Sequence, residues 1–307
     1  MAARRDSRKP RVNFFLSVRL TDPSIVSSIR DAQAAALVEH PGLKAAITCK
    51  PESAHFTLFV LALPDDASVG LAQQTLDAAA DDIQAAFSGA PCRLDLQGAG
   101  RFGSKVFYAT PVENEAMARL RTLVGKLHTR FTIAGLTEVG HSLKAGGSPR
   151  GWPTWDDLQA RAEDLNSADP DALDDLHALF TKKWTAHCTI FKSMTGSQGG
   201  RGRRQGSGRG AGRGGGRRGR RREAAAAQPE SAEAQPDAGT ALSDVAKVLE
   251  AHHSATVWGS ASPTGVELSK MGRMAPDGFY PSYGSSAFNP TDAAAAASEE
   301  SGKAPEA

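Results

Sequence analysis

Two heptapeptides of this chain have nearly the same sequence, although they lie far apart. Residues 53–59 read S-A-H-F-T-L-F, and residues 185–191 read T-A-H-C-T-I-F. Short alternating runs with aromatic and β-branched residues predict β-strands. Side chains alternate between the two faces of a strand, so one face of each copy carries a hydroxyl, an imidazole and a second hydroxyl, from Ser53, His55 and Thr57 in the first copy and Thr185, His187 and Thr189 in the second.

These two polar faces suit acid-base chemistry on a phosphate. Imidazole gives or takes a proton near neutral pH, and hydroxyls donate hydrogen bonds to non-bridging phosphate oxygens. If the strands face each other, one histidine can deprotonate an attacking oxygen while the other protonates the leaving oxygen, which cleaves a phosphodiester without a metal ion. We predict His55 and His187 as catalytic residues, Thr57 and Thr189 as phosphate-binding residues, and Ser53 and Thr185 as neighbours in the same cleft.

A single His-x-Thr sequence is a weak signal, because such a histidine commonly has an ordinary structural role in a strand. The matching flanks of the two copies favour a paired site. Which histidine is the base and which the acid depends on the direction of the substrate, so both assignments stay open. The other histidines lack this context and are expected at the surface or at helix ends: His40, His128, His141, His177, His252 and His253.

The rest of the chain alternates between strand-like and helix-like periodicity. Strands are predicted at residues 12–20, 54–63, 93–97, 105–111, 183–191 and 265–271, and helices at 23–40, 65–87, 114–134 and 242–253, with a helical insertion at 143–180. This order predicts an α+β fold of two lobes, in which two antiparallel sheets line a central cleft and the helices lie outside.

Residues 98–103 read G-A-G-R-F-G and match the G-x-G-x-x-G pattern of dinucleotide-binding loops. That pattern binds a pyrophosphate only where a helix begins directly after it. Here a strand-like K-V-F-Y-A-T follows, so residues 98–104 are interpreted as a hairpin turn whose glycines take positive φ. No cofactor is predicted.

The net charge of +2 conceals a strongly basic segment: residues 201–222 hold ten arginines and no acidic residue, which leaves 26 basic and 34 acidic side chains elsewhere. Glycines and mutually repelling arginines bury no apolar surface, so residues 195–238 are predicted to be a disordered insertion. Arg-Gly repeats resemble RNA-binding segments in which guanidinium groups pair with phosphates and stack on bases. A solubilising linker or a nuclear-import patch is the alternative. The candidate RNA-binding residues are Arg201, Arg203, Arg204, Arg209, Arg213, Arg217 and Arg218.

Residues 1–10 and 281–307 are predicted to be disordered, flanking a domain at 11–280. No apolar run reaches the ~18 residues of a membrane helix, and no secretory signal follows the basic start. The odd number of cysteines, at Cys49, Cys92 and Cys188, lacks metal-like spacing, so we expect reduced thiols and no metal site. We expect a monomer in the cytoplasm, the nucleus or both, without a membrane partner and with RNA or a nucleotide as substrate.

The motifs His55-Phe-Thr-Leu58 and His187-Cys-Thr-Ile190 resemble the two signatures of the 2H phosphoesterase superfamily. This superfamily includes LigT-like RNA 2',5'-ligases, cyclic phosphodiesterases and the central domain of A-kinase anchoring proteins. Further stretches are similar to the last of these branches: N-F-F-L-S-V-R at 13–19, G-A-G-R-F-G-S-K-V-F at 98–107, L-S-K-M-G at 268–272 and G-F-Y at 278–280. The resemblance covers about residues 11–280.

The resemblance implies a bilobal α+β fold in which His55 and His187 catalyse while Thr57 and Thr189 hold the phosphate. Such relatives bind nucleoside monophosphates or cleave 2',5'-linked or cyclic phosphodiesters, and some serve mainly as scaffolds. The sequence therefore predicts a metal-independent phosphodiesterase that acts on RNA or nucleotides with 2',5'-linked or 2',3'-cyclic phosphates. The alternative is a non-catalytic nucleotide- or RNA-binding scaffold module. No segment resembles a helix that would dock protein kinase A.

Overall fold

The computed structural model describes residues 11–40, 47–147, 151–166, 173–182, 184–192 and 238–289. Its strands are β1 (Phe14–Arg19), β2 (Ile47–Thr48), β3 (His55–Leu61), β4 (Leu94–Phe102), β5 (Val106–Pro111), β6 (Cys188–Lys192), β7 (Val257–Ala261), β8 (Gly265–Lys270) and β9 (Ser282–Ala287). Its helices are α1 (Pro23–Glu39), α2 (Asp66–Asp77), α3 (Ala80–Ala86), α4 (Glu115–Ile133), α5 (Glu138–Lys144), α6 (Trp155–Ala160), α7 (Asp174–Thr181) and α8 (Ala238–His252), with 3₁₀ turns η2 (Pro51–Ser53) and η3 (Glu163–Asn166). The predicted α+β class is confirmed.

The strands form one antiparallel sheet in the order β7-β4-β5-β6-β3-β1-β8-β9, with β2 paired to β6 beside this path. Its two halves, β7-β4-β5-β6 and β3-β1-β8-β9, correspond to the two sheets expected from the sequence. They meet where β3 and β6 share one register pair, Phe56 with Cys188, a contact that we call the seam. Because the two histidine-bearing strands pair with each other, the two expected sheets are halves of one continuous sheet.

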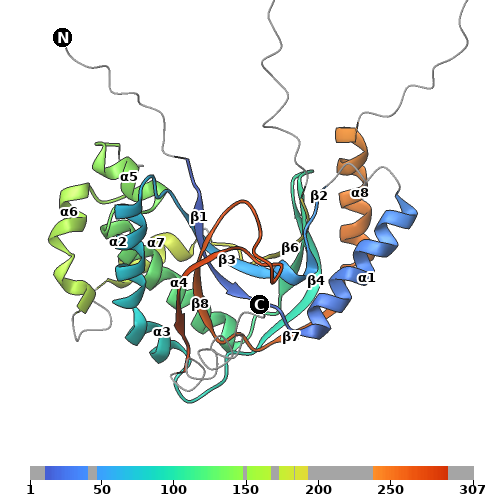
Figure 1. Ribbon diagram of the computed structural model, residues 1–307, viewed down its shortest axis with the longest axis horizontal. Helices are drawn as coiled ribbons and strands as arrows, with labels where there is room; N and C mark the ends of the chain where they lie inside the picture. Colours follow the sequence, from blue (N-terminus) through green and yellow to red (C-terminus); the bar gives the residue numbers. More distant parts are fainter. Residues whose placement is uncertain are drawn as a thin grey trace, which may run out of the picture.

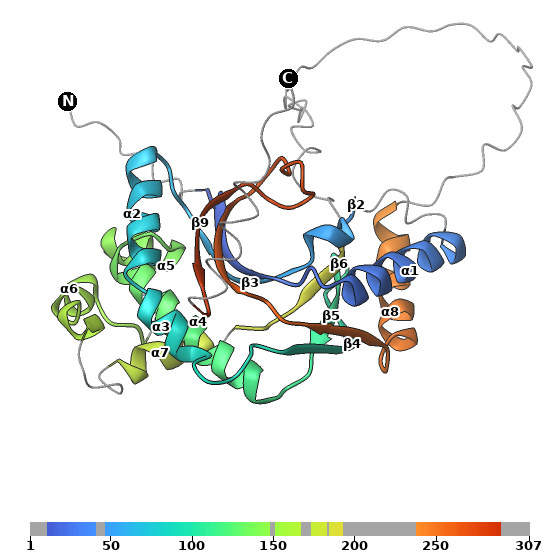
Figure 2. The same cartoon turned by 60° about the horizontal axis from the view of Figure 1, so that its bottom comes forward.

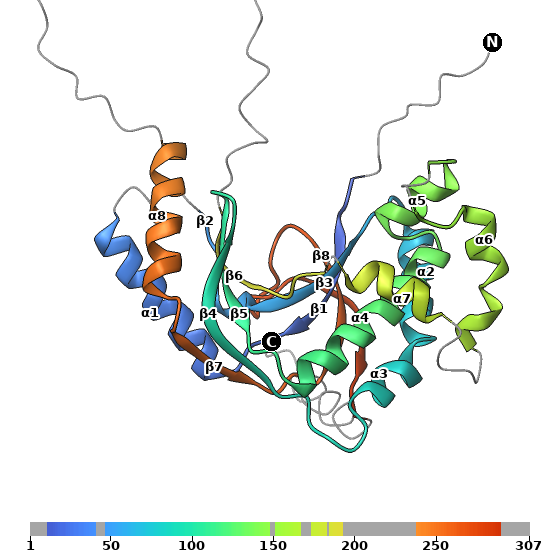
Figure 3. The ribbon, with the colours of Figure 1, turned by 180° about the vertical axis from the view of Figure 1, so that it is seen from behind.

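The helices lie outside the sheet in two groups (Figure 1 and Figure 2). α1 and α8 pack against strands of the β6 half, whereas α2 and α3 pack against β9 and α4 packs against β3. Two connections cross between the halves, because α1 follows β1 but covers the β6 half, and α4 follows β5 but covers β3. The view from behind shows the same division (Figure 3). These crossings tie the two halves into one body.

Helix α1 shows how the local sequence determines this packing. The Asp22 side chain accepts a hydrogen bond from the Ser24 amide, and Pro23 occupies the first helical turn, so the helix begins where capping chemistry predicts. Its buried apolar residues recur at helical spacing and form the stripe that faces the sheet: Ile25, Ile29, Ala32 and Ala36.

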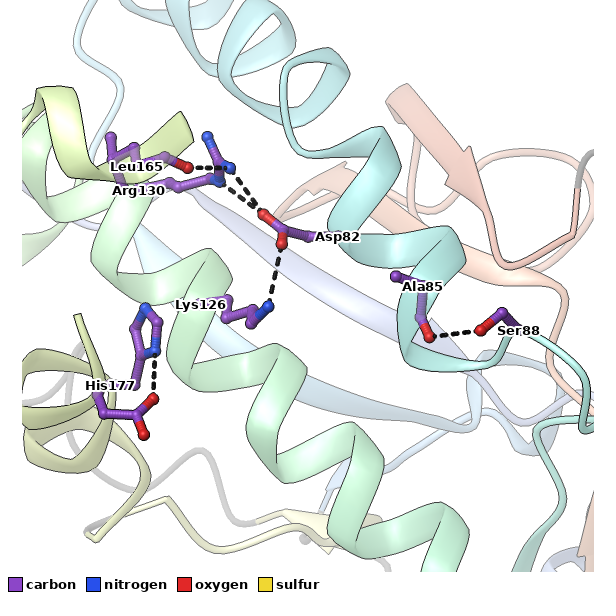
Figure 4. Close-up of polar contacts among 8 residues, drawn as sticks. Asp82, Ala85, Ser88, Lys126, Arg130, Leu165 and His177 are labelled. Atoms are coloured by element: carbon purple, nitrogen blue, oxygen red, sulfur yellow. Dashed lines mark hydrogen bonds and ion pairs between the residues drawn. The ribbon is translucent and has the colours of Figure 1, made fainter. Parts of the chain in front are cut away.

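A charged contact joins α3, α4 and the η3 turn (Figure 4). Asp82 accepts hydrogen bonds from Lys126 Nζ at 3.2 Å and from Arg130 Nη2 at 2.7 Å, and the same Arg130 nitrogen donates to the Leu165 carbonyl at 2.7 Å. Burial raises the pKa of the Asp82 carboxyl, but the hydrogen bonds and charge of Arg130 outweigh it, so the pKa is lowered overall. The contact fixes these helices as one unit beside β3.

The sequence predicts His128 at the surface or at a helix end, and the structure shows that this prediction is wrong. His128 lies inside α4, with its ring centroid 4.0 Å from that of Phe180 and 4.5 Å from that of Phe59. Position 128 falls on the helix face that also buries Val124 and Phe131, so the imidazole packs as an aromatic ring. Burial lowers the pKa of His128 to about 3.

Several predicted boundaries differ from the structure. The helix expected at 65–87 is divided into α2 and α3. The sequence did not indicate this break, because the alanine-rich turn between the two helices carries no stop signal. β4 continues to Phe102, so the hairpin turn spans 103–105 rather than 98–104. Gly98 and Gly103 have positive φ, at 77° and 57°, as expected, but Gly100 lies within the strand opposite Tyr108. β6 begins at Cys188 instead of residue 183.

The folded domain extends beyond its expected end at residue 280. β9 lies inside the segment 281–307 that was expected to be disordered, and it forms one edge of the sheet by pairing with β8. Its sequence S-Y-G-S-S-A has no apolar alternation, so neighbouring contacts hold it instead. The Tyr283 ring meets Phe14 at 5.1 Å between centroids, and Phe288 meets Phe87 at 4.5 Å.

The remaining predicted segments are only partly described. The helical insertion expected at 143–180 contains α6, η3 and α7. α8 begins at Ala238, four positions before the helix expected at 242. Residues 1–10, 193–237 and 290–307 lie outside the described residues, and the predictions of disorder there stay predictions. Within the described part of the chain, no helix has the length and apolarity needed to span a bilayer.

Candidate active site

His55 and His187 each directly precede the residue that pairs at the seam. His55 is the first residue of β3, and His187 lies immediately before β6. Their following residues, Phe56 and Cys188, form the register pair between the strands, and both are completely buried. The core side of the sheet therefore anchors the two strands at the point where the histidines project from the other side.

Continuing the antiparallel register from the seam relates each histidine to the threonine of the other motif. Neighbouring strands run in opposite directions, so continuing the register by one residue on each side of the seam sets His55 opposite Thr189 and His187 opposite Thr57. The four side chains share one face of the sheet. The two motifs are therefore related by an approximate twofold axis through the seam.

Main-chain carbonyls orient both imidazoles in the same way. Nδ1 of His55 lies 2.7 Å from the Ser53 carbonyl oxygen, and Nδ1 of His187 lies 2.8 Å from that of Thr185. A carbonyl oxygen only accepts, so each Nδ1 carries a hydrogen and each neutral ring keeps its lone pair on Nε2. Thr57 Oγ1 lies 3.1 Å from Nε2 of His55 and donates to it. Nε2 is thus the atom on which each ring can take or give a proton.

Ser53 and Thr185, expected as hydroxyl-bearing neighbours, contact the histidines through their carbonyl oxygens. The Ser53 hydroxyl instead donates to the Lys50 carbonyl at 2.7 Å, because residues 51–53 form a 3₁₀ turn rather than the start of the strand. Thr185 precedes β6, and it is exposed. The two residues orient imidazoles rather than extend a row of hydroxyls.

Aromatic rings surround His55. Its ring centroid lies 5.2 Å from that of Phe15, 5.7 Å from Phe279 and 5.8 Å from Tyr280. Phe279 and Tyr280 belong to the loop between β8 and β9, which therefore covers the histidine end of β3.

This enclosure determines the charge state of His55. Burial lowers the pKa of His55 to about 4, the hydrogen bond to Ser53 opposes this shift, and the nearby positive charges of His187 and Lys192 add to it. His55 is accordingly neutral in the free protein at neutral pH, which is the state that a general base requires.

Arg19 holds the covering loop in place. Its guanidinium forms a two-nitrogen contact with Glu267 of β8, in which Nη2 lies 2.8 Å from Oε1, and it also pairs with Asp277 at 3.1 Å. The guanidinium carbon lies 3.8 Å from the centroid of the Phe279 ring. Arg19 is the register partner of His55 on β1, so this cluster lies directly beside the first histidine.

His187 has fewer aromatic neighbours and a more open position. Phe102 meets it edge to face at 4.8 Å between centroids, with an interplanar angle of 90°, and Tyr108 lies at 5.3 Å. Burial lowers the pKa of His187, the hydrogen bond to Thr185 opposes this, and the charge of Lys192 adds to the lowering. Because His187 is less enclosed than His55, it is the ring that keeps a proton more readily.

A β-bulge brings Lys192 to the same face as the histidine. Phe191 pairs with Phe107, but Thr189 pairs with the next residue, Tyr108, so the bulge leaves one additional residue of β6 between these pairs. After the bulge, Lys192 pairs with Val106 and shares the face of Thr189 and Tyr108. Its ammonium acts electrostatically on both imidazoles. Strict alternation would have pointed this cation into the core.

Trp184 connects the two motifs across the seam. Its indole Nε1 donates to the Thr57 carbonyl oxygen at 3.1 Å, and its ring packs against the core. The Arg121 guanidinium lies 5.6 Å from the centroid of the Trp184 ring, and it donates to the Trp184 carbonyl at 3.4 Å. Since Phe56 and Cys188 form the one register pair between the described strands β3 and β6, this hydrogen bond is a second contact that determines their separation.

The predicted arginines of the Arg-Gly segment, from Arg201 to Arg218, lie outside the described residues. In the part that the structure does describe, no group of three or more His, Cys, Asp or Glu side chains is placed to hold a metal ion. The described cysteines are unpaired, and burial raises the pKa of Cys188 to about 12.

Sequence reasoning missed the residues that surround the two imidazoles. Phe102, Phe279 and Tyr280 all lie in stretches quoted for their resemblance to a family, which was the available signal. Trp184 lies three positions before His187, and only the structure shows that it contacts Thr57. Lys192 could not be placed, because nothing in the sequence indicates a bulge.

Comparison with known proteins identifies the family of this domain. Residues 12–288 match the family model described as the AKAP7 2'5' RNA ligase-like domain. No curated protein sequence is significantly similar to the chain. Among solved structures, the chain is similar to the crystal structure of TT0787 of Thermus thermophilus, with 13% identity, a TM-score of 0.41, and coverage of 90% of this chain and 97% of that one. The family model spans nearly all of the described domain, and the chain therefore belongs to the AKAP7 2'5' RNA ligase-like family of 2H phosphoesterases.

Proposed function

We propose that this chain is a metal-independent phosphodiesterase that cleaves 2',5'-linked or 2',3'-cyclic phosphodiesters of RNA or nucleotides by two-histidine acid-base catalysis. The observation that carries the proposal is the pair of imidazoles beside the seam, each held by a carbonyl on Nδ1, which leaves Nε2 as the atom that exchanges a proton. Two such groups supply both proton transfers that an in-line displacement needs.

The unequal surroundings of the two rings support one assignment of the base and the acid. When the pair holds one proton, that proton lies on the histidine with the higher pKa. His55 is the more enclosed ring and has a pKa of about 4, so the proton lies on His187. In this state His55 removes the proton from the attacking oxygen, and His187 gives its proton to the leaving oxygen.

The charged phosphorane between the two rings needs donors that do not take part in proton transfer. Thr57 and Thr189 carry hydroxyls on the same face as the histidines, and Lys192 brings a cation to that face. Such preorganised groups stabilise charge that develops in the transition state. We expect Lys192→Gln to lower kcat more than it raises KM.

Turnover of a panel of phosphodiesters tests this function. Purified protein is assayed in EDTA against 2',5'-oligoadenylate, 2',3'-cyclic nucleotides and 3',5'-linked RNA, together with His55→Gln and His187→Gln. His252→Gln, which changes an exposed histidine of α8, is the matched control. We expect cleavage of 2',5'-oligoadenylate, of 2',3'-cyclic nucleotides or of both. We expect activity to fall by about 10²- to 10⁴-fold in His55→Gln and in His187→Gln, and to remain complete in the control. Activity that survives either change, or nucleotide binding without any turnover, contradicts the proposal; the second result favours the scaffold alternative.

We further propose that the Arg-Gly segment captures RNA for this site in the cytoplasm or the nucleus. Arginine contacts with phosphate release counterions, so binding weakens as the salt concentration rises. On single strands, each contact contributes about −0.7 to the slope of the logarithm of the binding constant against the logarithm of the salt concentration. Deleting residues 196–222 is expected to weaken binding of long RNA and flatten this slope, while cleavage of a dinucleotide is unchanged. An unchanged slope rules out capture by this segment.

A further inference from the structure

One aromatic side chain of the site is exposed although it contacts other rings of the site. Phe102 is 40% exposed, and it is the only aromatic ring among the exposed large apolar side chains of the described residues, the others being Val38, Leu71, Val248 and Val257. A single exposed apolar residue is ordinary on a protein surface. Phe102 differs because its ring is in direct contact with a histidine of the candidate active site.

The neighbours of Phe102 hold its ring in a defined position. It packs on Tyr108 at 4.5 Å between centroids, with an interplanar angle of 32°. Tyr108 in turn lies across Gly100 of β4, where a Cβ atom would stand 2.7 Å from the tyrosine ring. The position therefore requires glycine so that Tyr108 can lie flat against the strand.

Ionic contacts fix the hairpin that carries this ring pair. Arg101 Nε donates to Glu250 of α8 at 2.6 Å, and its Nη1 donates to the Gly103 carbonyl at 3.1 Å. The turn after Phe102 is thus tied both to itself and to a helix. Together, Phe102 and Tyr108 form a rigid two-ring layer beside His187, which we call the hairpin platform.

We propose that the exposed part of the Phe102 ring stacks on the nucleobase of the nucleoside that leaves from the His187 side. This inference rests on the proposed function, because it assigns the leaving oxygen to His187. A flat π-system is the part of a nucleotide that recognises an exposed aromatic ring, and base-aromatic stacking tolerates any base. A 5'-linked nucleoside extends from its phosphate oxygen through one ribose to its base, which suits a platform in contact with the acid that protonates that oxygen. The platform therefore selects a nucleoside leaving group over a small alcohol.

Binding measurements test the platform separately from turnover. Calorimetry compares adenosine 5'-monophosphate, uridine 5'-monophosphate and ribose 5-phosphate on the full chain. The wild-type protein is expected to bind both nucleotides more tightly than the sugar phosphate, and the purine more tightly than the pyrimidine. Stacking is worth about 1–3 kcal/mol per base, so Phe102→Leu is expected to weaken the binding of the nucleotides by about 5- to 150-fold and to leave that of ribose 5-phosphate unchanged.

Variants separate stacking from mere support of His187. Phe102→Trp keeps a π face and is expected to retain nucleotide affinity, whereas Leu71→Ala, an exposed apolar change on α2, is the matched control that alters nothing. An equal loss for all three ligands in Phe102→Leu means that the ring only supports the site, and no loss means that the base lies elsewhere; either result overturns the proposal. This test measures binding and not turnover. It therefore still applies if the phosphodiesterase proposal fails, and a negative result for the platform does not decide whether the chain cleaves phosphodiesters.

Discussion

The two halves of the site begin from nearly the same seven residues and end in different environments. His55 lies beside Phe15 of β1 and beside Phe279 and Tyr280, which belong to the loop held by the Arg19 cluster. His187 lies before its strand begins, with Phe102 and Tyr108 along one side. The matched motifs keep the same tautomer, and the unmatched surroundings set different pKa values. A repeated motif can thus supply one base and one acid, because the residues around it are not repeated.

Removing either imidazole has the largest expected effect. His55→Gln and His187→Gln each remove one of two proton transfers, so each is expected to lower kcat by about 10²- to 10⁴-fold. Because the two groups act in one displacement, the double variant is expected to lose little more than either single one. Steady-state kinetics of the three variants checks this. Losses that multiply in the double variant would mean that the histidines act independently.

The pH dependence of the free energy of unfolding compares His55 with His187. The folded pKa of His55, about 4, lies below its ordinary value of 6.5, so the unfolded chain binds more protons between these pH values. The contribution of neutral His55 to the free energy of unfolding is therefore complete above pH 6.5 and is lost as the pH falls toward 4. His55→Gln is expected to remove up to about 3 kcal/mol of this loss, and His187→Gln less. Urea unfolding at pH 7, 6, 5 and 4 measures both, and equal slopes in the two variants would contradict the difference in enclosure.

Opening the aromatic cover is expected to reduce the difference between the histidines. Tyr280→Leu gives water access to His55, so its pKa is expected to rise by about one unit, equivalent to about 1.4 kcal/mol, while that of His187 stays unchanged. Phe102→Leu on the other side is expected to affect His187 alone. Histidine ring signals followed by NMR from pH 3 to 8 report the pKa values of both rings. If Tyr280→Leu shifts the pKa of His187, or Phe102→Leu shifts that of His55, the assignment of each aromatic side chain to the histidine it covers is wrong.

The tether across the seam has the smallest expected effect. Trp184→Phe keeps a ring but removes the donor to the Thr57 carbonyl, which is expected to cost about 1 kcal/mol of stability and about 5- to 10-fold in kcat with little change in KM. Trp155→Phe, in α6, is the control of the same kind. If both variants behave alike in kcat, Trp184 only fills space.

The placement of the two histidine-threonine pairs was predictable from the sequence, because strand alternation acts within a few residues. It placed His55 with Thr57 and His187 with Thr189, and the apolar residues between them are buried. Periodicity gave the order of the six expected strands for the same reason, but it missed β2 and β7. It also missed the edge strand β9, since the pairing of β9 with β8 and the packing of Tyr283 are not visible in its own residues.

The differences between the two halves were not predictable, because they depend on contacts between distant segments. The bulge after Thr189 moves Lys192 to the site face, and a bulge leaves no periodic signal. The single pair at the seam joins Phe56 to Cys188, which are far apart in the sequence, so two sheets were expected where one exists. The charge states of the histidines follow from such contacts and not from their motifs.

A substrate with an activated leaving group tests the division of labour between the two histidines most directly. A nucleoside 2'-(p-nitrophenyl phosphate) with a free 3'-hydroxyl still needs a base for attack, but its phenolate leaves without protonation. If His55 is the base and His187 the acid, His187→Gln recovers most of its lost activity on this substrate, whereas His55→Gln stays inactive. Recovery by His55→Gln with no recovery by His187→Gln would reverse the assignment, and equal behaviour of the two variants would contradict the account.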